Sequence, residues 1–209
     1  MNRWLLAAGV VLGLAAIAIS AYVAGHHFIP QEVGIEDDVQ GTNWGPLALT
    51  FPVFTWIGDA KGFFIEIAIF VLILIVNRAA WLFAAGAVLT GAWYEAVSHL
   101  IVRPRPTAAQ VLHVYEHPGA SSYPSGHSMF IVTVTVVLML CIGYRFLPRA
   151  LYPVGWALVV LIVAANGIAR VYSGAHWPTD VVGGVLIASA WLVLLASVRA
   201  IDSRIRPSP

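Results

Sequence analysis

The sequence predicts an all-α, polytopic membrane protein with six transmembrane helices. First, 60% of its 209 residues are hydrophobic and only 10% are charged, whereas an ordinary soluble domain carries about 25% charged residues. Second, the mean hydropathy is +0.85, and a soluble chain of this length has too much surface for its volume to bury so much apolar area. Third, apolar runs long enough to cross a bilayer alternate with polar segments. We therefore predict one membrane-embedded domain over residues 1–209.

The first predicted transmembrane helix runs from Trp4 to Ala24. Arg3 precedes it, as in a signal peptide, but the run is longer than the roughly 7–15 apolar residues of a signal peptide. We interpret it as a spanning helix, with a cleaved signal peptide as the alternative. Residues 26–44 are polar and predict a loop. Leu47 to Ile57 is apolar, aromatic and interrupted by Pro52, which indicates a short interfacial segment in the first outer loop.

Five further apolar runs complete the predicted bundle. They extend from Gly62 to Val76, from Ala80 to Val102, from Gly126 to Tyr144, from Leu151 to Val171 and from Val181 to Val198. A long loop rich in proline, histidine and serine joins the third run to the fourth, and a short polar turn joins the fifth to the sixth. We expect the core of the domain at about residues 50–195 and a flexible tail at residues 200–209.

The arginines orient the predicted bundle. Six spans place both termini on one side, and positive charge marks the cytoplasmic side of a membrane protein. The arginines on the side of the termini are Arg3, Arg78, Arg145, Arg149, Arg199, Arg204 and Arg206. Both termini are therefore predicted to be cytoplasmic, in a multi-pass protein of the plasma membrane. Arg103, Arg105 and Arg170 lie on the outer side, against this rule, and require a local reason.

The outer ends of the predicted helices gather groups that bind anions. Ser125 and Gly126 stand at the N-terminus of the fourth helix, where free backbone N–H groups and the helix dipole favour negative charge. Gly126 lets the backbone approach a phosphate closely. Arg105 and Arg170 can each hold phosphate oxygens through two parallel hydrogen bonds. These residues together predict a phosphate-binding site on the outer face.

Two histidines and a carboxylate supply reactive groups at the same face. His176 and Asp180 are four residues apart, and Pro178 suits the first position of a helix, so the carboxylate would lie over the imidazole. Asp180 could then hold the proton of one ring nitrogen and leave the other as a nucleophile. His127 is available as general acid and then base. Each short motif alone is weak, and the prediction depends on their shared order, spacing and side of the membrane.

The remaining polar residues do not predict a metal site or a nucleic-acid partner. The loop histidines are His26, His27, His113 and His117. They lack nearby carboxylates or further ligands at the spacing of a closed metal site, so we expect no metal and no cofactor. A net charge of +1 gives no general attraction to nucleic acid. Membrane lipids are the expected partners, and the oligomeric state is left open.

The combined pattern resembles the type 2 phosphatidic acid phosphatase family, the integral-membrane relatives of vanadium haloperoxidases. That family has three motifs, K-x6-R-P, P-S-G-H and S-R-x5-H-x3-D. The segment from Pro124 to His127 matches the second motif. Arg170, His176 and Asp180 match the third motif at its spacings, and Arg105 with the following proline matches the end of the first. The resemblance extends over the predicted core, about residues 50–195, and includes six spans with the motifs at their outer ends.

Two positions depart from these motifs. Ser98 stands where the family has its leading lysine, and Ala169 stands where it has a serine. The loss of the lysine removes one positive charge directed at phosphate, and His99 or Arg103 could replace it as a substrate-binding group. This leaves three possibilities open: a rearranged but active site, an altered substrate preference, or weakened catalysis.

The resemblance implies a metal-independent lipid phosphate phosphatase whose active site faces the extracytoplasmic side. In this hypothesis His176 attacks phosphorus and forms a phosphohistidine, while Asp180 stabilises its charge and His127 protonates the leaving oxygen. The expected substrates are phosphatidic acid, phosphatidylglycerol phosphate or a polyprenyl pyrophosphate. Two alternatives remain: a lipid phosphotransferase that uses the same intermediate, and a catalytically weak lipid-binding or transport protein.

Overall fold

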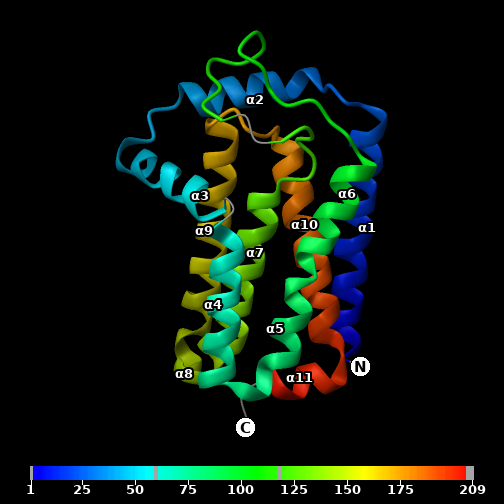
Figure 1. Ribbon diagram of the computed structural model, residues 1–209, viewed down its shortest axis with the longest axis vertical. Coiled ribbons are helices and arrows are strands. Elements are labelled where there is room, and N and C mark those ends of the chain that lie inside the picture. Colours follow the sequence, from blue (N-terminus) through cyan, green and yellow to red (C-terminus); the bar gives the residue numbers. More distant parts are fainter. Residues whose placement is uncertain (1, 59–60, 117–118, 206–209) are drawn as a thin grey trace.

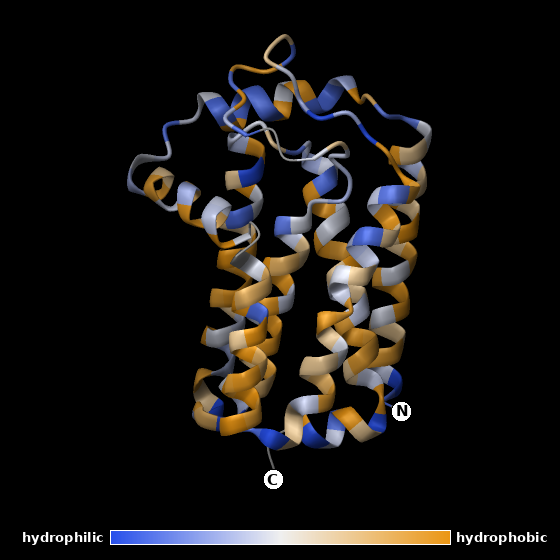
Figure 2. Ribbon diagram, in the orientation of Figure 1, coloured by the Kyte–Doolittle hydropathy of each residue, from blue (hydrophilic) through white to orange (hydrophobic). Residues whose placement is uncertain are grey.

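The computed structural model describes residues 2–58, 61–116 and 119–205. Within these ranges four helical segments are long and apolar enough to cross a membrane: α1 (Arg3–Gly25), α7 with its continuation (Gly126–Phe146), α9 with the turn before it (Arg149–Tyr172) and α10 (Pro178–Ser197). They form one bundle with α4 (Lys61–Val76), α5 (Trp81–Val88) and α6 (Thr90–Leu100) (Figure 1). Figure 2 shows hydrophobic residues along the length of the bundle and hydrophilic residues at its two ends. The chain is thus an integral membrane protein.

Four of the six predicted spans are therefore met by helices of spanning length. The second predicted span is α4, which has 16 residues, fewer than the roughly 20 that a spanning helix needs. The third predicted span, Ala80 to Val102, is broken at Leu89 into α5 and α6. Thr90 Oγ1 donates to the Ala87 carbonyl at 2.7 Å, and Gly91 follows. A hydroxyl bonded to the preceding turn and a glycine both weaken a helix, which accounts for the break.

The segment that follows α1 corrects the predicted loop over residues 26–44. It contains α2 (Pro30–Gly41), which begins with a proline at its first position, and α2 lies across the end of the bundle opposite the termini (Figure 1). We call this end the distal end. Glu32 and Glu36 belong to α2, and their acidic side chains are buried. The predicted loop would have exposed both side chains to water. The predicted interfacial segment falls on a 3-10 helix (Gly45–Thr50) and α3 (Phe51–Gly58).

The C-terminal segment corrects the predicted flexible tail over residues 200–209. Arg199–Ile205 forms the helix α11, because Ile201 and Ile205 pack into the apolar core. Asn2 Nδ2 also donates to Asp202 Oδ2 at 3.4 Å, so both ends of the chain meet at the end of the bundle away from α2. Arg206 and the rest of the predicted tail lie outside the described residues, as does His117.

Helix α7 stands at the centre of the bundle and sets the position of the site. It packs against α9, α10, α6 and α5, and its Met129 is buried in the core with Phe83 and Leu192. Helix α1 lies against α10, where a β-carbon at Gly9 would be only 2.8 Å from the Leu194 side chain. This close packing aligns the first residues of α7 and α10 with the last residues of α9 at the distal end.

The buried carboxyl of Glu36 makes the stability of the protein depend on pH. Burial, and next the charge of Asp180, raise the pKa of Glu36 from 4.5 to about 8. Because the folded state holds this proton more tightly than the unfolded state, the stability contributed by Glu36 falls as pH rises from about 4.5 to about 8, by at most about 1.4 kcal/mol per pH unit. We expect Glu36→Gln to raise the melting temperature in detergent more at pH 8 than at pH 5. An equal shift at both pH values would contradict this.

Candidate active site

Three helix ends meet at the distal end and bring the predicted site residues together. Helices α7 and α10 begin there and α9 ends there (Figure 1). The predicted residues on these ends are His127, Arg170, His176 and Asp180. The Ser125 N–H donates to the Asp180 carbonyl at 3.0 Å, which ties the start of α7 to the first turn of α10. The loop between α6 and α7 passes over the same end.

His176 lies in the connection between α9 and α10 and is almost fully buried. Its Nδ1 is 2.7 Å from the Ser122 carbonyl oxygen, which can only accept a hydrogen bond, so Nδ1 carries the proton. Its Nε2, the nitrogen without a proton, is 3.4 Å from Arg105 Nη1. Burial, and next the charge of Arg105, hold the pKa of His176 well below its usual value. A neutral imidazole with an available nitrogen lone pair is the nucleophilic form of histidine.

Asp180 is close to His176, but it does not accept the imidazole proton as we predicted. Its Oδ2 is 3.9 Å from His176 Nδ1 and accepts a hydrogen bond from the Trp177 N–H at 2.9 Å. The Ser122 carbonyl instead fixes the tautomer. The Asp180 carboxylate lies behind the ring as a negative charge, which favours a positively charged imidazole.

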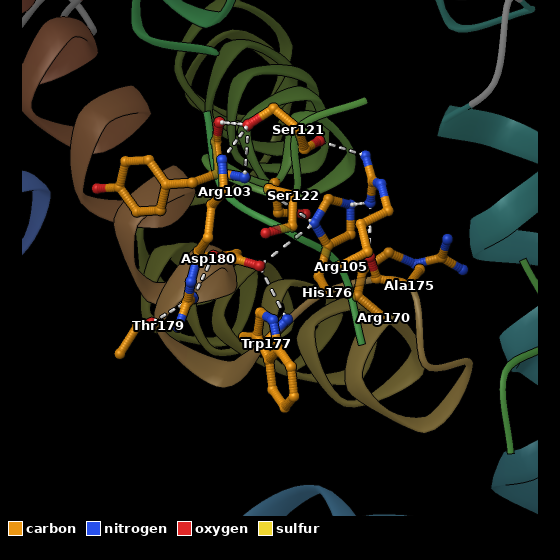
Figure 3. Close-up of polar contacts among 12 residues, drawn as sticks. Arg103, Arg105, Ser121, Ser122, Arg170, Ala175, His176, Trp177, Thr179 and Asp180 are labelled. Atoms are coloured by element: carbon orange, nitrogen blue, oxygen red, sulfur yellow. Dashed lines mark hydrogen bonds and ion pairs between the residues drawn. The ribbon is translucent and has the colours of Figure 1, made fainter. Parts of the chain in front are cut away.

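Arg103, which we predicted to bind the substrate, is not among the residues that line the cavity beside His176, whereas Arg105 is. The side chain of Arg103 is completely buried, and Figure 3 shows Arg103 and Arg105 on opposite sides of the pair formed by His176 and Asp180. The donors of Arg103 are shared among Asp180 Oδ1 at 2.6 Å, Glu32 Oε2 at 2.5 Å, Thr179 Oγ1 at 2.9 Å and the His27 carbonyl at 3.1 Å. Glu32 Oε1 in turn accepts from the backbone and hydroxyl of Thr179, both at 2.8 Å. Arg103 therefore contacts the first turn of α10 through Thr179 and Asp180.

Arg105 is the guanidinium that faces the cavity. Three backbone carbonyls hold it, those of Ala175 at 2.5 Å, Ser121 at 2.6 Å and Gly119 at 3.2 Å. Burial lowers the pKa of Arg105, and the nearby Tyr94, Asp180 and Glu116 act in the opposite direction. A fixed guanidinium next to the unprotonated nitrogen of His176 is an arrangement that can hold a phosphoryl oxygen beside its nucleophile.

Arg170, at the end of α9, contacts protein groups that resemble a phosphate in their chemistry. Its Nη1 donates to Glu116 Oε2 at 2.8 Å, and its Nη2 donates to the Thr55 hydroxyl. The Thr55 hydroxyl also donates to Glu116 Oε1 at 2.7 Å. Arg170 is completely buried and is not among the residues that line the cavity beside His176, so a phosphoryl oxygen would reach its guanidinium only by displacing Glu116.

His127 stands on the first turn of α7, under α3. Its Nε2 is 3.3 Å from the Thr55 carbonyl oxygen, so in this contact Nε2 carries a proton. Helix α3 approaches so closely that a β-carbon at Gly58 would lie 2.0 Å from the imidazole. Only a glycine at this position lets α3 cover His127.

A cavity of about 300 Å³ joins these groups and extends into the bundle between α4, α6 and α7. Its lining includes the predicted residues Arg105, Gly126, His127 and His176. Three other predicted substrate-binding residues do not line it: Arg170, Ser125 and His99. The Ser125 hydroxyl is buried and accepts from the Ser128 N–H, which caps α7. The side chain of His99 is 80% exposed.

Several residues of the site were missed by the sequence interpretation: Glu32, Thr55, Tyr94, Glu116 and Ser122. Glu32 and Glu116 are acids in outer segments, and the unexplained outer arginines were the available signal that some acids there would be paired. Ser122 acts through its backbone carbonyl, which no residue type reveals. Tyr94 lies inside the third predicted span, where an aromatic residue by itself does not indicate a site.

Removing the carboxylate of Glu116 is expected to strengthen the binding of small phosphate analogues. Glu116 occupies the guanidinium of Arg170 that an anion would otherwise contact, so we expect Glu116→Gln to lower the inhibition constant of orthovanadate by about three- to tenfold, roughly the 1 kcal/mol net contribution of one hydrogen bond. Glu95→Gln is the matched control, because it removes the same charge from a side chain that is 66% exposed. Equal inhibition constants in the wild type and Glu116→Gln would contradict this prediction.

The structure is a membrane helix bundle with two histidines and an arginine around one cavity at its end, and comparison with known families shows which family it belongs to. The sequence model of the PAP2 superfamily matches residues 79–204, a range that holds the predicted catalytic residues. The chain therefore belongs to the PAP2 superfamily.

Known proteins of that family share parts of this sequence. The undecaprenyl-diphosphatase of Sulfolobus acidocaldarius is 37% identical over 38% of this chain and 34% of its own length. Phosphatidylglycerophosphatase B of Bacillus subtilis is 34% identical over 51% of this chain and 49% of its own length. The matches thus span about a third to a half of these two relatives.

A solved structure shares the whole fold. The crystal structure of a transmembrane PAP2-type phosphatidylglycerolphosphate phosphatase from Bacillus subtilis superposes with a TM-score of 0.72 and covers 95% of this chain and 97% of that one. The identity is 21%, so the likeness concerns the fold.

Proposed function

We propose that this protein is a phosphatase that hydrolyses a phosphomonoester or pyrophosphate of a membrane lipid. The observation that carries the proposal is the geometry of His176: the Ser122 carbonyl holds its Nδ1 proton, while its Nε2 meets Arg105 in the cavity. Such an arrangement presents a nucleophile and a phosphate-binding cation to the same small volume.

In the proposed first step, His176 Nε2 attacks phosphorus and the bond from phosphorus to the lipid oxygen breaks. Arg105 and the backbone N–H groups at Gly126 neutralise the charge that spreads over the phosphoryl oxygens, and Arg170 joins them when the phosphoryl group displaces Glu116. His127 gives its proton to the leaving oxygen. The leaving oxygen would take the place of the Thr55 carbonyl, which now accepts from His127 Nε2.

In the second step, water attacks phosphorus and the bond to His176 breaks. His127, now unprotonated, takes a proton from the water. The positive charge that His176 carries in the phosphohistidine is stabilised by the Asp180 carboxylate, 3.9 Å from Nδ1. Arginine side chains provide the positive charge in this scheme, so we propose a metal-independent reaction.

We propose that the protein lies in the plasma membrane with six crossings, formed by the four long segments, α4 and the α5–α6 pair. The distal end would face the extracytoplasmic side, because the arginines near the termini favour a cytoplasmic position for the other end. The cavity continues from His176 towards Glu66, Thr90 and Thr133 within the bundle. The lipid chains could therefore remain in the bilayer while the phosphate reaches the distal end.

The test is a phosphate-release assay with purified protein in detergent or vesicles. The panel holds phosphatidic acid, phosphatidylglycerol phosphate, a polyprenyl phosphate and a polyprenyl pyrophosphate, which are the lipid classes suggested by the resemblance and by the names of the relatives. We expect release from at least one lipid, and inhibition by orthovanadate. Protein carrying His176→Ala, prepared identically, measures the contribution of contaminating phosphatases.

Two other results would overturn the proposal. Transfer of labelled phosphate to an added acceptor lipid, without release to water, would identify a phosphotransferase. Binding of lipid phosphates and orthovanadate without any turnover would identify a lipid-binding protein that retains the fold and the site.

A further inference from the structure

The cavity lacks a cation at the position where the family motif has a lysine. Ser98 stands there, and its hydroxyl donates to the Glu95 carbonyl at 3.1 Å within its own helix. The two replacements that the sequence suggested do not reach the cavity. The side chain of His99 is 80% exposed, and Arg103 is held by buried acids. The α6 side of the cavity therefore needs another group if it is to contact a phosphoryl oxygen.

Tyr94 lies on this side of the cavity. It belongs to α6 and shares the cavity lining with Arg105, His127 and His176. Its ring lies against the first residue of α7: a β-carbon at Gly126 would be 3.0 Å from Cε2 and 3.3 Å from Cζ, the carbon that bears the hydroxyl. No hydrogen bond to another described residue engages this hydroxyl. The phenol thus ends beside the backbone N–H groups that begin α7.

Helix geometry relates Tyr94 to the missing lysine. Residues 94 and 98 are one turn apart on the same face of α6. Helical side chains lean towards the N-terminus of their helix, so a long side chain at position 98 would cover the turn that carries Tyr94. A serine at position 98 is too short to do so. Of the two hydroxyls of α6 that line the cavity, that of Thr90 is bonded to the Ala87 carbonyl, which leaves the phenol of Tyr94 to donate to a ligand.

We propose that Tyr94 is a substrate-binding residue that donates a hydrogen bond from its hydroxyl to a phosphoryl oxygen, in place of the ammonium group of the family lysine. The inference rests on the proposed phosphatase function and adds a residue to that site. The phenol supplies a donor without a charge, and hydrogen bonds to anionic oxygens are about twice as strong as those between neutral groups.

Tyr94→Phe tests this directly, because it removes one oxygen and keeps the ring against Gly126. We expect kcat/KM for the best substrate of the lipid panel to fall about ten- to hundredfold, the effect of losing a hydrogen bond to a charged group. Tyr152→Phe is the matched control. Its hydroxyl donates to the Tyr144 carbonyl at 3.0 Å, at the end of α9 away from the site, and we expect its activity to match the wild type.

Ser98→Lys supplies the second measurement. In the Tyr94→Phe background we expect it to recover most of the lost activity, whereas in the wild type we expect a much smaller gain, because the two side chains would serve the same oxygen. Full activity in Tyr94→Phe would overturn the proposal. So would an equal factor of improvement by Ser98→Lys in both backgrounds, since independent groups give additive effects.

Orthovanadate binding separates failure of this inference from failure of the proposed function. If the wild type is active and Tyr94→Phe equals it, only the role of Tyr94 fails. If the wild type releases no phosphate from any lipid, the proposed function fails, and orthovanadate affinity then decides about Tyr94. A several-fold weaker affinity in Tyr94→Phe would support the contact, and an equal affinity would overturn it.

Discussion

Replacing His176 with alanine is expected to abolish phosphate release, with a fall in turnover of at least about a thousandfold, because the attacking atom is removed and no phosphohistidine can form. The protein should still fold, since His176 contributes one hydrogen bond to the Ser122 carbonyl. The measurement is phosphate release, together with capture of the intermediate. Enzyme mixed with lipid carrying labelled phosphate is denatured in alkali, where phosphohistidine survives, and the label on protein is counted.

His127→Ala is the matched comparison, because it removes the second imidazole of the cavity. Loss of a general acid and base costs about a hundred- to ten-thousandfold in turnover, but the nucleophile remains, so the label should still appear on the protein. The mechanism would be refuted by labelled protein in His176→Ala, or by labelling that is lost only in His127→Ala.

Replacing Arg103 with glutamine is expected to destabilise the protein strongly and to lower kcat. Arg103 is the positive partner of two buried carboxylates, Glu32 and Asp180. Removing one partner of a buried ion pair costs about 3–5 kcal/mol, because a charge is left uncompensated. The activity should fall through kcat, since the position of Asp180 behind His176 depends on this contact. Melting curves in detergent and steady-state kinetics measure the two effects.

Arg105→Gln is the matched variant two positions later in the same loop. Arg105 faces the cavity and is bonded to backbone carbonyls, so its loss should raise KM and weaken orthovanadate binding with a smaller change in melting temperature. A Arg103→Gln variant with an unchanged melting temperature and a raised KM would show that Arg103 binds phosphate, as its place in the sequence first suggested.

Much of the fold follows from local sequence properties. The four segments of spanning length begin and end within a few residues of the predicted positions, because long apolar runs bounded by polar residues leave little choice in a membrane. The shapes of the shorter elements were not predictable in this way. The break at Leu89 depends on the Thr90 hydroxyl bonded to the preceding turn. Helix α2 lies where its Glu32 meets Arg103, 71 residues away in the sequence.

The site was predictable where a role belongs to a side chain at a helix end. His127, His176 and Arg105 line one cavity, and their motifs had predicted that they would lie together. The direction of each side chain could not be derived. Arg103 and Arg105 are separated by one residue in an extended segment, and successive side chains there point to opposite sides. Arg105 lines the cavity and Arg103 is buried among acids. The sequence pattern alone does not say which arginine takes which position.

The contact of Glu32 with Arg103 has a consequence for the inheritance of this fold. The family match begins at residue 79, yet the counter-charge of Arg103 comes from α2, some distance before that boundary. A fragment cut to the matched region would retain every motif and leave a buried guanidinium short of an anion. Exchange of segments between relatives should therefore succeed only when α2, the loop of Arg103 and the first turn of α10 move together. The segment that must be exchanged as a whole thus extends from α2 to α10, beyond the region that carries the family motifs.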